Sequence, residues 1–593
     1  MHHGTGKMYR VVPQSNYFFT FNTCNSRTKK KEVAFNKEVV KDLIDIPIFL
    51  ASNGLAFRGH REGWKNRNRG NFLSLVDLFS KRSPCMAAYT SKLQNSSKKS
   101  HVSFISKLRQ NQLIDSIGKI ILTVIQTDVK YARFFSISID STFDASRKEQ
   151  VAFVIRYVHN KTSIISERLI AVKESSNTSG SELFTLFQLV CSERNLDWKN
   201  YLIGQSYDGA PNMRGQFEGL RSHVQKVNSS ALYVWCHAHR LNLVLSRVVG
   251  CCKDAMNVFG NLVECYERHY KQLYPKQQMC QLKRAATTRM SFSVALVTVL
   301  DTFEAVVVAL DEIQSKEGPD DKKIGHLAGC LSDYLLSERF LLIAHCFKKI
   351  FSILAPVNQI LQKSDLDLLA AVNCIEETRE SIRKLCCDTV FMDIVKEKEY
   401  FESSSSFCFT KLKKFHIRRK KLMPGETSQD DSSQDPLHNI KVNSFFYCLD
   451  IIDQSFETYF SKESLEVYKD LSLFSRKRLK DFNNTIYFNF ESTSNLPKTF
   501  HENHLESIDS QDDCDSEDLE NIEDENSKEK NNLSNITTVY DVFVAGGLIE
   551  VFPTLNNALH IALTLPVSSA STERKFSKLK IVKNRLRTTM TQE

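Results

Sequence analysis

The chain has 593 residues, too many for one compact core, and a prior of roughly one domain per 150 residues predicts a multidomain protein. Its apolar content of 42% suits globular cores, and its formal charge of +10 permits nucleic-acid binding without establishing it. No N-terminal segment has the apolar core of a signal peptide, and the apolar stretch Ser293–Leu310 is interrupted by Asp301 and Glu304. We expect a soluble intracellular protein with no membrane partner.

The sixteen cysteines follow no regular framework. The adjacent pairs Cys251-Cys252 and Cys386-Cys387 would form strained bridges if they were oxidised, so reduced thiols are expected. No Cys-x-x-Cys pair occurs, so the sequence predicts no complete structural zinc finger.

Residues 1–130 form a basic N-terminal lead-in that is expected to be mostly helical from about residue 40. Apolar residues recur at helical spacing in Asn71–Phe79 and in Leu113–Val129. A preceding Gly/Asn-rich loop carries five basic residues, which either hold phosphates or form a solvated loop: Arg58, Arg61, Lys65, Arg67 and Arg69.

Residues 131–250 predict an α/β sheet of mixed direction, because three strands precede alternating helices and strands. The expected strands are Phe134–Ile139, Val151–Val158, Ser166–Val172, Tyr201–Ile203 and Ala231–Trp235. The expected helices are Ser179–Cys191, Phe217–Val227 and His239–Val249.

Residues 251–545 predict a large all-helical insertion, with long helical patterns such as Phe340–Leu354 and Phe445–Phe460. Within it, residues 501–533 are rich in Asp and Glu, so repulsion between like charges predicts disorder there. The run Arg418–Lys421 predicts nuclear import, with a solvated basic surface as the alternative. Order is expected to return before a final segment, residues 546–593.

Three separated carboxylates could share one site. Asp140 ends an apolar strand, Asp208 follows a short strand within Gly204–Asn212, and Glu573 lies in the first turn of a late helix. Phosphodiester cleavage can use two Mg²⁺ ions about 4 Å apart, and carboxylates hold such ions. Taken singly, each residue also has a local explanation. Asp140 could cap a turn, Asp208-Gly is a common turn dipeptide, and the helix macrodipole favours Glu573.

The pair Cys236-x-x-His239 follows the fifth strand and offers two soft ligands, where a structural zinc site needs four. A buried structural pair is the favoured interpretation. Arg240, Arg284 and Arg289 are candidates for phosphate contacts or, equally, for surface and packing roles.

These residues together resemble the zinc-finger MYM-type protein 1-like branch of the hAT superfamily of transposases, and the similarity covers about residues 40–593. The motifs that carry it are Leu50–His60, Phe135–Asp140 with Asp144, Lys148–Gln150, Tyr207–Met213, Cys236–Leu243, Ser571–Ser577 and Asn584–Arg587.

The resemblance implies an RNase H-like core that a large helical insertion interrupts before the last catalytic helix. It implies that Asp140, Asp208 and Glu573 form an Asp-Asp-Glu triad for two divalent ions, Mg²⁺ or Mn²⁺. It also implies that Cys236 and His239 support the active site structurally. Such enzymes cut flanking DNA with water and then use a 3′ hydroxyl for strand transfer. Their C-terminal region dimerises, so DNA and a second copy of the chain are the implied partners.

Three departures from the family pattern lead us to expect a fragmentary or decayed copy. The zinc-finger module that usually precedes the core is missing. Met290, beside Arg289, stands where relatives tend to have a Trp that stacks on a base, a contact worth about 1–3 kcal/mol. The chain also ends at Glu593, where relatives continue through more of the dimerisation region.

The resulting hypothesis is a nuclear, transposon-derived protein that dimerises and retains the metal triad, with DNA binding left open and with doubtful transposition activity. Its expected DNA contacts are Arg240, Arg289 and Met290. The alternative is an active, divalent-metal-dependent DNA transposase.

Overall fold

The computed structural model describes residues 27–59, 66, 69–95, 103–144, 146–159, 164–265, 291–317, 322–413, 435–460, 471 and 536–582. The chain divides into two compact units, Met1–Ile121 and Leu122–Glu593. Several features predicted above lie outside the described residues, namely the acidic segment 501–533, Arg284, Arg289, Met290, Arg418–Lys421 and Asn584–Arg587.

The first unit is helical. It contains α1 (Arg27–Ser52), α2 (Asn71–Ser80), α3 (Pro84–Asn95) and the first part of α4 (Lys107–Ala132). These helices enclose a small core that includes Leu43, Phe72 and Met86. Two residues of the predicted basic loop are held inside this unit. Arg58 donates to the carbonyl of Lys107 at 2.8 Å, and Arg69 pairs with Asp77 at 2.8 Å.

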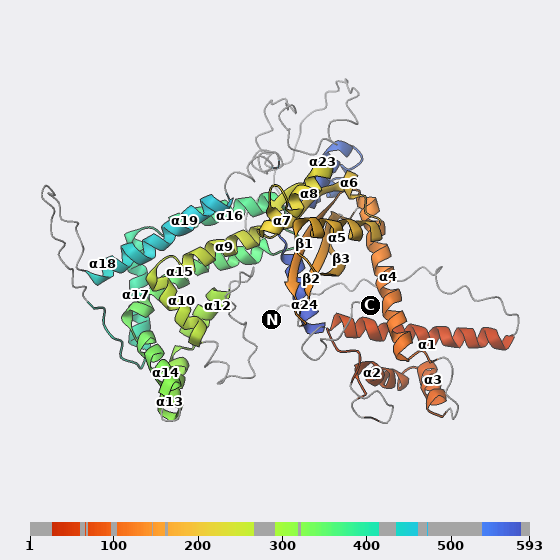
Figure 1. Cartoon of the computed structure of the whole chain (residues 1–593), viewed down its shortest axis with the longest axis horizontal. Coiled ribbons are helices and arrows are strands. Elements are labelled where there is room, and N and C mark those ends of the chain that lie inside the picture. The colour runs from red at the N-terminus through yellow and green to blue at the C-terminus, as the bar shows by residue number, and fades with distance from the viewer. Residues whose placement is uncertain are drawn as a thin grey trace, which may run out of the picture. The chain divides into compact units, whose positions relative to one another are not determined.

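The second unit contains a five-stranded sheet in the order β3-β2-β1-β4-β5, which confirms the predicted α/β fold with a mixed sheet. Figure 1 labels its strands β1, β2 and β3. Antiparallel pairing joins β1 (Phe135–Phe143), β2 (Glu149–Val158) and β3 (Ile165–Ser175). Parallel pairing adds β4 (Leu202–Tyr207) and β5 (Leu232–Trp235) beside β1.

β2 is buried on both faces, which explains why its sequence is a continuous apolar run rather than an alternation. On one face, Phe153 and Ile155 share a core with α4, α5 (Gly180–Glu193) and α8 (Leu220–Val227). The short helices α6 (Trp198–Tyr201) and α7 (Pro211–Arg214) lie in the connections around β4.

The other face is covered by the end of the chain. α23 (Pro553–Thr564) contacts β1, β2 and β4, and α24 (Ala570–Val582) contacts β1, β2 and β3. Ser136 on β1 donates its hydroxyl to the carbonyl of Thr564 at 2.6 Å. Gly204 on β4 allows Pro566 to cross the strand, because a Cβ there would lie 2.6 Å from Pro566 Cδ.

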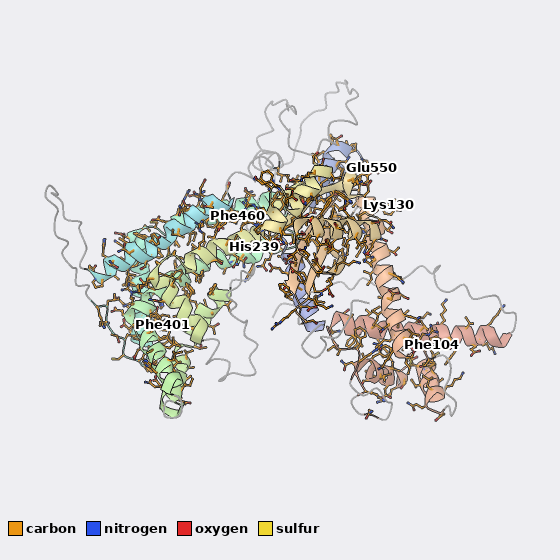
Figure 2. All side chains as sticks on the ribbon, in the orientation of Figure 1. Phe104, Lys130, His239, Phe401, Phe460 and Glu550 are labelled. Atoms are coloured by element: carbon orange, nitrogen blue, oxygen red, sulfur yellow. The ribbon has the colours of Figure 1, made fainter. Side chains whose placement is uncertain are left out.

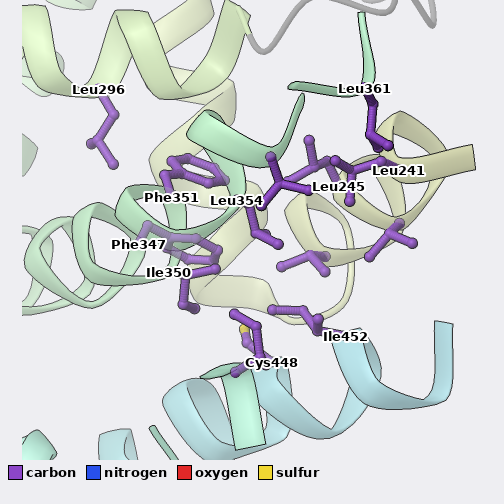
Figure 3. Packing of buried hydrophobic residues seen from close by; sticks show 14 of the residues in the cluster. Leu241, Leu245, Leu296, Phe347, Ile350, Phe351, Leu354, Leu361, Cys448 and Ile452 are labelled. Carbon is purple, nitrogen blue, oxygen red and sulfur yellow. The ribbon is translucent and has the colours of Figure 1, made fainter. Parts of the chain in front are cut away.

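A helical block fills the interval between β5 and this final segment. It is held by one large apolar core, in which Phe347, Phe351 and Leu354 pack near Leu241 and Leu245 of α9 (His237–Val249; Figure 3). The other described helices of the block are α10 (Lys253–Cys265), α12 (Ser291–Asp301), α13 (Phe303–Glu317), α14 (Lys322–Leu335), α15 (Glu338–Leu361), α16 (Leu368–Arg383), α17 (Asp388–Ser404), α18 (Pro436–Ile440), η2 (Lys441–Phe446), α19 (Tyr447–Phe460) and α22 (Ile536–Ala545).

Within the described residues, α15 is the single helix long and apolar enough by itself to cross a membrane. The bent pair Phe292–Asp301 and Phe303–Ser315 meets the same criterion only if it is taken as one span. In α15, 67% of the apolar window is buried inside the protein. Packing within the helical block therefore accounts for its composition.

Candidate functional site

Asp140 lies on β1, and Asp208 directly follows β4, the parallel neighbour of β1. Ser138 of β1 is paired with Ser206 of β4, and each aspartate follows its serine by two residues. The carboxyl ends of adjacent parallel strands meet at one edge of a sheet, so the pairing brings both aspartates to that edge. This edge is where ligands bind in many α/β proteins.

The turn after β4 is fixed by local contacts. Asp208 Oδ1 accepts a hydrogen bond from the backbone N–H of Ala210 at 3.2 Å, as in an Asx turn. Gly209 packs against the Trp235 indole, where a Cβ would lie 2.7 Å from Cζ2. The Asp-Gly dipeptide thus does form a turn, and that turn holds the Asp208 carboxylate at the end of the strand.

Glu573 reaches the same region from the first turn of α24. Asp140 interacts electrostatically with both Glu573 and Asp208, and the side chain of Thr572, the neighbour of Glu573, lowers the pKa of Asp140. The structure therefore gathers the three carboxylates that the sequence singled out.

The environment penalises negative charge at this site. Burial, and then the charges of Glu573 and Asp208, raise the pKa of Asp140 well above its usual range. Among the described residues, no Lys or Arg forms an ion pair with Asp140 or Asp208. A cation would relieve this repulsion, and three carboxylates offer the hard oxygen ligands that Mg²⁺ and Mn²⁺ prefer.

The three carboxylates do not form a compact single-ion cluster in this structure. In the described part of the chain, their ligand atoms do not all lie within 4.8 Å of one another. Oxygens bound to a single Mg²⁺ at about 2.1 Å lie no more than about 4.2 Å apart.

Cys236, at the end of the sheet, contacts the final segment of the chain, and His239 lies beside it on α9. The Cys236 thiol is fully buried and accepts hydrogen bonds from the backbone N–H of His239 at 3.4 Å and of Ser569 at 3.2 Å. Burial lowers the pKa of His239, whereas the charge of nearby Asp208 raises it. His239 lies in the first turn of α9 (Figure 2). Within the described residues neither side chain joins a set of three metal ligands.

The sequence analysis predicted that Arg240 contacts DNA, with a role in packing as an equally weighted alternative. Its side chain is 4% exposed, its Nε donates to the carbonyl of Tyr459, and its guanidinium lies over the rings of Trp235 and Phe460. These contacts give Arg240 a packing role between α9 and α19. The predicted contacts of Arg289 and Met290 with DNA stay predictions, because both residues lie outside the described part.

Sequence reasoning missed the residues that hold α24 against the sheet. Arg156 on β2 is 2% exposed and donates to Glu167 at 3.0 Å and to the carbonyl of Leu563 at 3.1 Å. Glu167 also accepts the hydroxyl of Ser571, two residues before Glu573. The sequence did contain a signal for this contact, because Arg156 is a charged residue inside the apolar run Val151–Val158. A buried arginine needs partners, so its position indicated a buried ion pair or hydrogen bonds.

Comparison with known families gives two matches. In the sequence, one precedes the helical block and the other follows most of it. Residues 7–219 match the family described as ZMYM1/FAM200, RNase-like domain, which covers Asp140 and Asp208. Residues 548–593 match the hAT family C-terminal dimerisation region, which covers Glu573. The RNase-like match agrees with the mixed sheet. Together the two matches support an hAT-transposase-derived protein of the ZMYM1/FAM200-like type.

Proposed function

We propose that this chain is a dimerising nuclear protein that binds DNA and holds two divalent ions at Asp140, Asp208 and Glu573. The observation that carries the proposal is that Asp140 on β1 interacts electrostatically with Asp208 in the turn after β4 and with Glu573 in the first turn of α24. Mg²⁺ or Mn²⁺ would neutralise the clustered charge and could polarise a phosphate group. The protein's own contribution is to fix the three carboxylates on a strand, a turn and a helix.

Metal binding is tested separately from dimerisation, DNA binding and nuclear localisation, because those properties do not depend on it. Calorimetry with Mn²⁺ compares the wild-type chain with Asp140→Ala. We expect binding to the wild type and at least a tenfold loss of affinity in the variant. Asp393→Ala is the matched control, since that exposed aspartate lies on α17 and pairs only locally with Lys396 at 3.0 Å. A folded wild type that binds no Mn²⁺ would refute the metal site.

Self-association is supported by an exposed apolar group inside the matched dimerisation region. Val551, Phe552 and Leu555 are 63%, 50% and 40% exposed. A contiguous set of large apolar side chains on a surface commonly marks an interface. We infer that this end of α23 forms part of the contact between two copies of the chain.

Phe552→Ser tests this interface without weakening the helix. Phe552 is the N-cap of α23, and Ser is among the preferred N-cap residues. Light scattering during size-exclusion chromatography should show a dimer for the wild type and more monomer for the variant. Phe217→Ser is the control, because that ring is 79% exposed in a loop outside the region. An unchanged dimer in Phe552→Ser would place the interface elsewhere.

The second candidate is an active transposase, which the same grouping of three carboxylates favours. A nicking assay on duplex DNA with Mg²⁺ separates the two functions. Cleavage that Asp140→Asn abolishes would establish the enzyme, whereas a folded, Mn²⁺-binding chain that does not cut DNA supports the first proposal. Binding of DNA by this chain in a salt titration tests the DNA-binding part separately.

Nuclear localisation rests on the run Arg418–Lys421. A tagged chain with these four residues changed to Ala should lose nuclear enrichment. Unchanged nuclear enrichment would rule out this run as the import signal.

A further inference from the structure

Three cysteines from distant parts of the sequence meet in the helical block. Cys251 and Cys252 lie between α9 and α10, and Cys448 lies in the first turn of α19. In the described part of the chain, this is the one group of three potential metal ligands whose ligand atoms all lie within 4.8 Å of one another. None of the three residues belongs to the carboxylate site or to the Cys236–His239 pair.

The sulfur spacing matches ligands that share an ion. Cys448 Sγ lies 3.3 Å from Cys251 Sγ and 4.0 Å from Cys252 Sγ. Around a tetrahedral Zn²⁺ with Zn–S bonds of about 2.3 Å, the sulfurs lie about 3.8 Å apart. A disulfide has an S–S bond of about 2.05 Å and would leave the third thiol unused. The three-sulfur cluster therefore fits metal coordination better than a single bridge.

The surroundings of the three cysteines stabilise thiolates and give an ion access from solvent. Cys252 Sγ accepts the backbone N–H of Ala255 at 3.4 Å, in the first turn of α10. A helix N-terminus stabilises a thiolate, which is the form that binds metal. Cys448 is 2% exposed, whereas Cys251 and Cys252 are partly exposed. The partly exposed side gives access and a position for a solvent ligand.

The cluster lies at the opposite end of a helix pair from the carboxylate site. α9 and α19 contact each other, and the end of α19 packs on Arg240 and His237 near the start of α9. The pair is therefore antiparallel, with Cys448 and Tyr459 separated by about 17 Å of helix at 1.5 Å per residue. An ion at the thiols would fasten one end of this pair, while Arg240 fastens the other.

We propose that Cys251, Cys252 and Cys448 bind one soft metal ion, either Zn²⁺ with a solvent molecule as fourth ligand or Cu(I) with three thiolates. Soft thiolate ligands select these ions over Mg²⁺. The ion would cross-link the start of α10 to α19, since Cys251 and Cys448 are 197 positions apart in the sequence.

The test uses the full chain kept in a thiol-free reductant. Elemental mass spectrometry after dialysis against Zn²⁺, and separately against Cu(I), measures the ions retained per chain. We expect one equivalent of one of these ions in the wild type and its loss in Cys448→Ser. Co²⁺ titration provides a second readout, because thiolate coordination adds a charge-transfer absorbance that the variant should lack.

The chain contains a matched control for the local motif. Cys386 and Cys387 are also adjacent and directly precede a helix, α17, but no third thiol joins them within the described residues. The double variant Cys386→Ser, Cys387→Ser should keep the ion. Asp140→Ala should also keep it, which separates this site from the carboxylate site.

Cys448 is buried, so circular dichroism must show that its variant is folded. If Cys448→Ser does not fold, the double variant Cys251→Ser, Cys252→Ser gives an independent test, because both of its positions are partly exposed. Retention of the ion in both thiol variants, or no retained ion in the folded wild type, would overturn the proposal. A Cys251–Cys448 disulfide that forms without reductant, with no ion bound after reduction, would also overturn it.

Discussion

Arg156→Met should strongly destabilise the second unit, because Arg156 joins three separate segments of the chain. Its guanidinium pairs with Glu167 at 3.0 Å and donates to three backbone carbonyls, those of Leu563 at 3.1 Å, Ser364 at 2.8 Å and Leu366 at 2.8 Å. Methionine preserves much of the apolar stem but none of these bonds.

The magnitude follows from what the substitution leaves behind. Removing one partner of a buried ion pair costs about 3–5 kcal/mol, because the other charge stays buried. The orphaned carbonyls add to this unless water reaches them, at about 1–3 kcal/mol each. We therefore expect unfolding to become easier by about 4 kcal/mol or more, a large share of the roughly 5–15 kcal/mol typical of a folded protein.

The assay is urea unfolding followed by tryptophan fluorescence, since Trp198 and Trp235 both lie in the second unit. Arg156→Lys should fall between the wild type and Arg156→Met, because a lysine can pair with Glu167 but cannot serve all four acceptors. Lys173→Met is the control. Its more exposed pair with Glu193, at 2.8 Å, should contribute no more than about 1 kcal/mol.

A second readout connects this contact to the candidate site. Glu167 accepts the hydroxyl of Ser571, so loss of Arg156 also removes a partner from the group that holds the start of α24. Mn²⁺ affinity should then fall even where the variant remains folded. An Arg156→Met protein within 1 kcal/mol of the wild type, with unchanged Mn²⁺ affinity, would refute this reasoning.

Three further predictions concern single positions. Gly204→Ala should destabilise the protein by about 1–3 kcal/mol, because its Cβ would lie 2.6 Å from Pro566 Cδ. Gly118→Ala in α4, where a Cβ would have no atom within 4 Å, should instead stabilise the protein by up to about 1 kcal/mol. Thermal unfolding of both variants and the wild type measures these changes. Without divalent ions, Asp140→Asn should be more stable than the wild type at neutral pH. The pKa of Asp140 is raised in the folded state, which therefore holds the proton more tightly than the unfolded chain does. The stability of the wild type should fall as pH rises from the usual Asp range through the folded pKa. The difference in stability between the wild type and Asp140→Asn should vanish at acidic pH. Asp367→Ala should lower the free energy of unfolding in urea by about 2–4 kcal/mol, because Asp367 caps two helices. Its carboxylate accepts hydrogen bonds from the backbone N–H groups of Ala370 and Ile536, both at 2.8 Å. Asp367→Asn should lose less stability, and equal losses in the two variants would contradict the capping role.

The sequence predicted most of the sheet because strand periodicity is a local property. Val151–Val158 and Ser166–Val172 were predicted as strands, and β2 and β3 contain both ranges. β4 was predicted to be shorter, because Gln205 and Ser206 do not look like strand residues. Both are fully buried, and Gln205 donates to the Ala231 carbonyl at 2.8 Å, so a tertiary hydrogen bond overrides the composition.

By itself, the sequence determined the candidate chemistry, namely carboxylates at the ends of predicted strands and at the start of a late helix. Only the tertiary structure brought them together. Ser136 and Thr564 are hydrogen-bonded across 428 residues, and this return of the chain carries Glu573 to Asp140. The same packing buried Arg240 and assembled Cys251 and Cys252 with Cys448. Periodicity reports which face of an element is apolar, but it does not specify which distant element will cover that face, and these sites depend on that pairing.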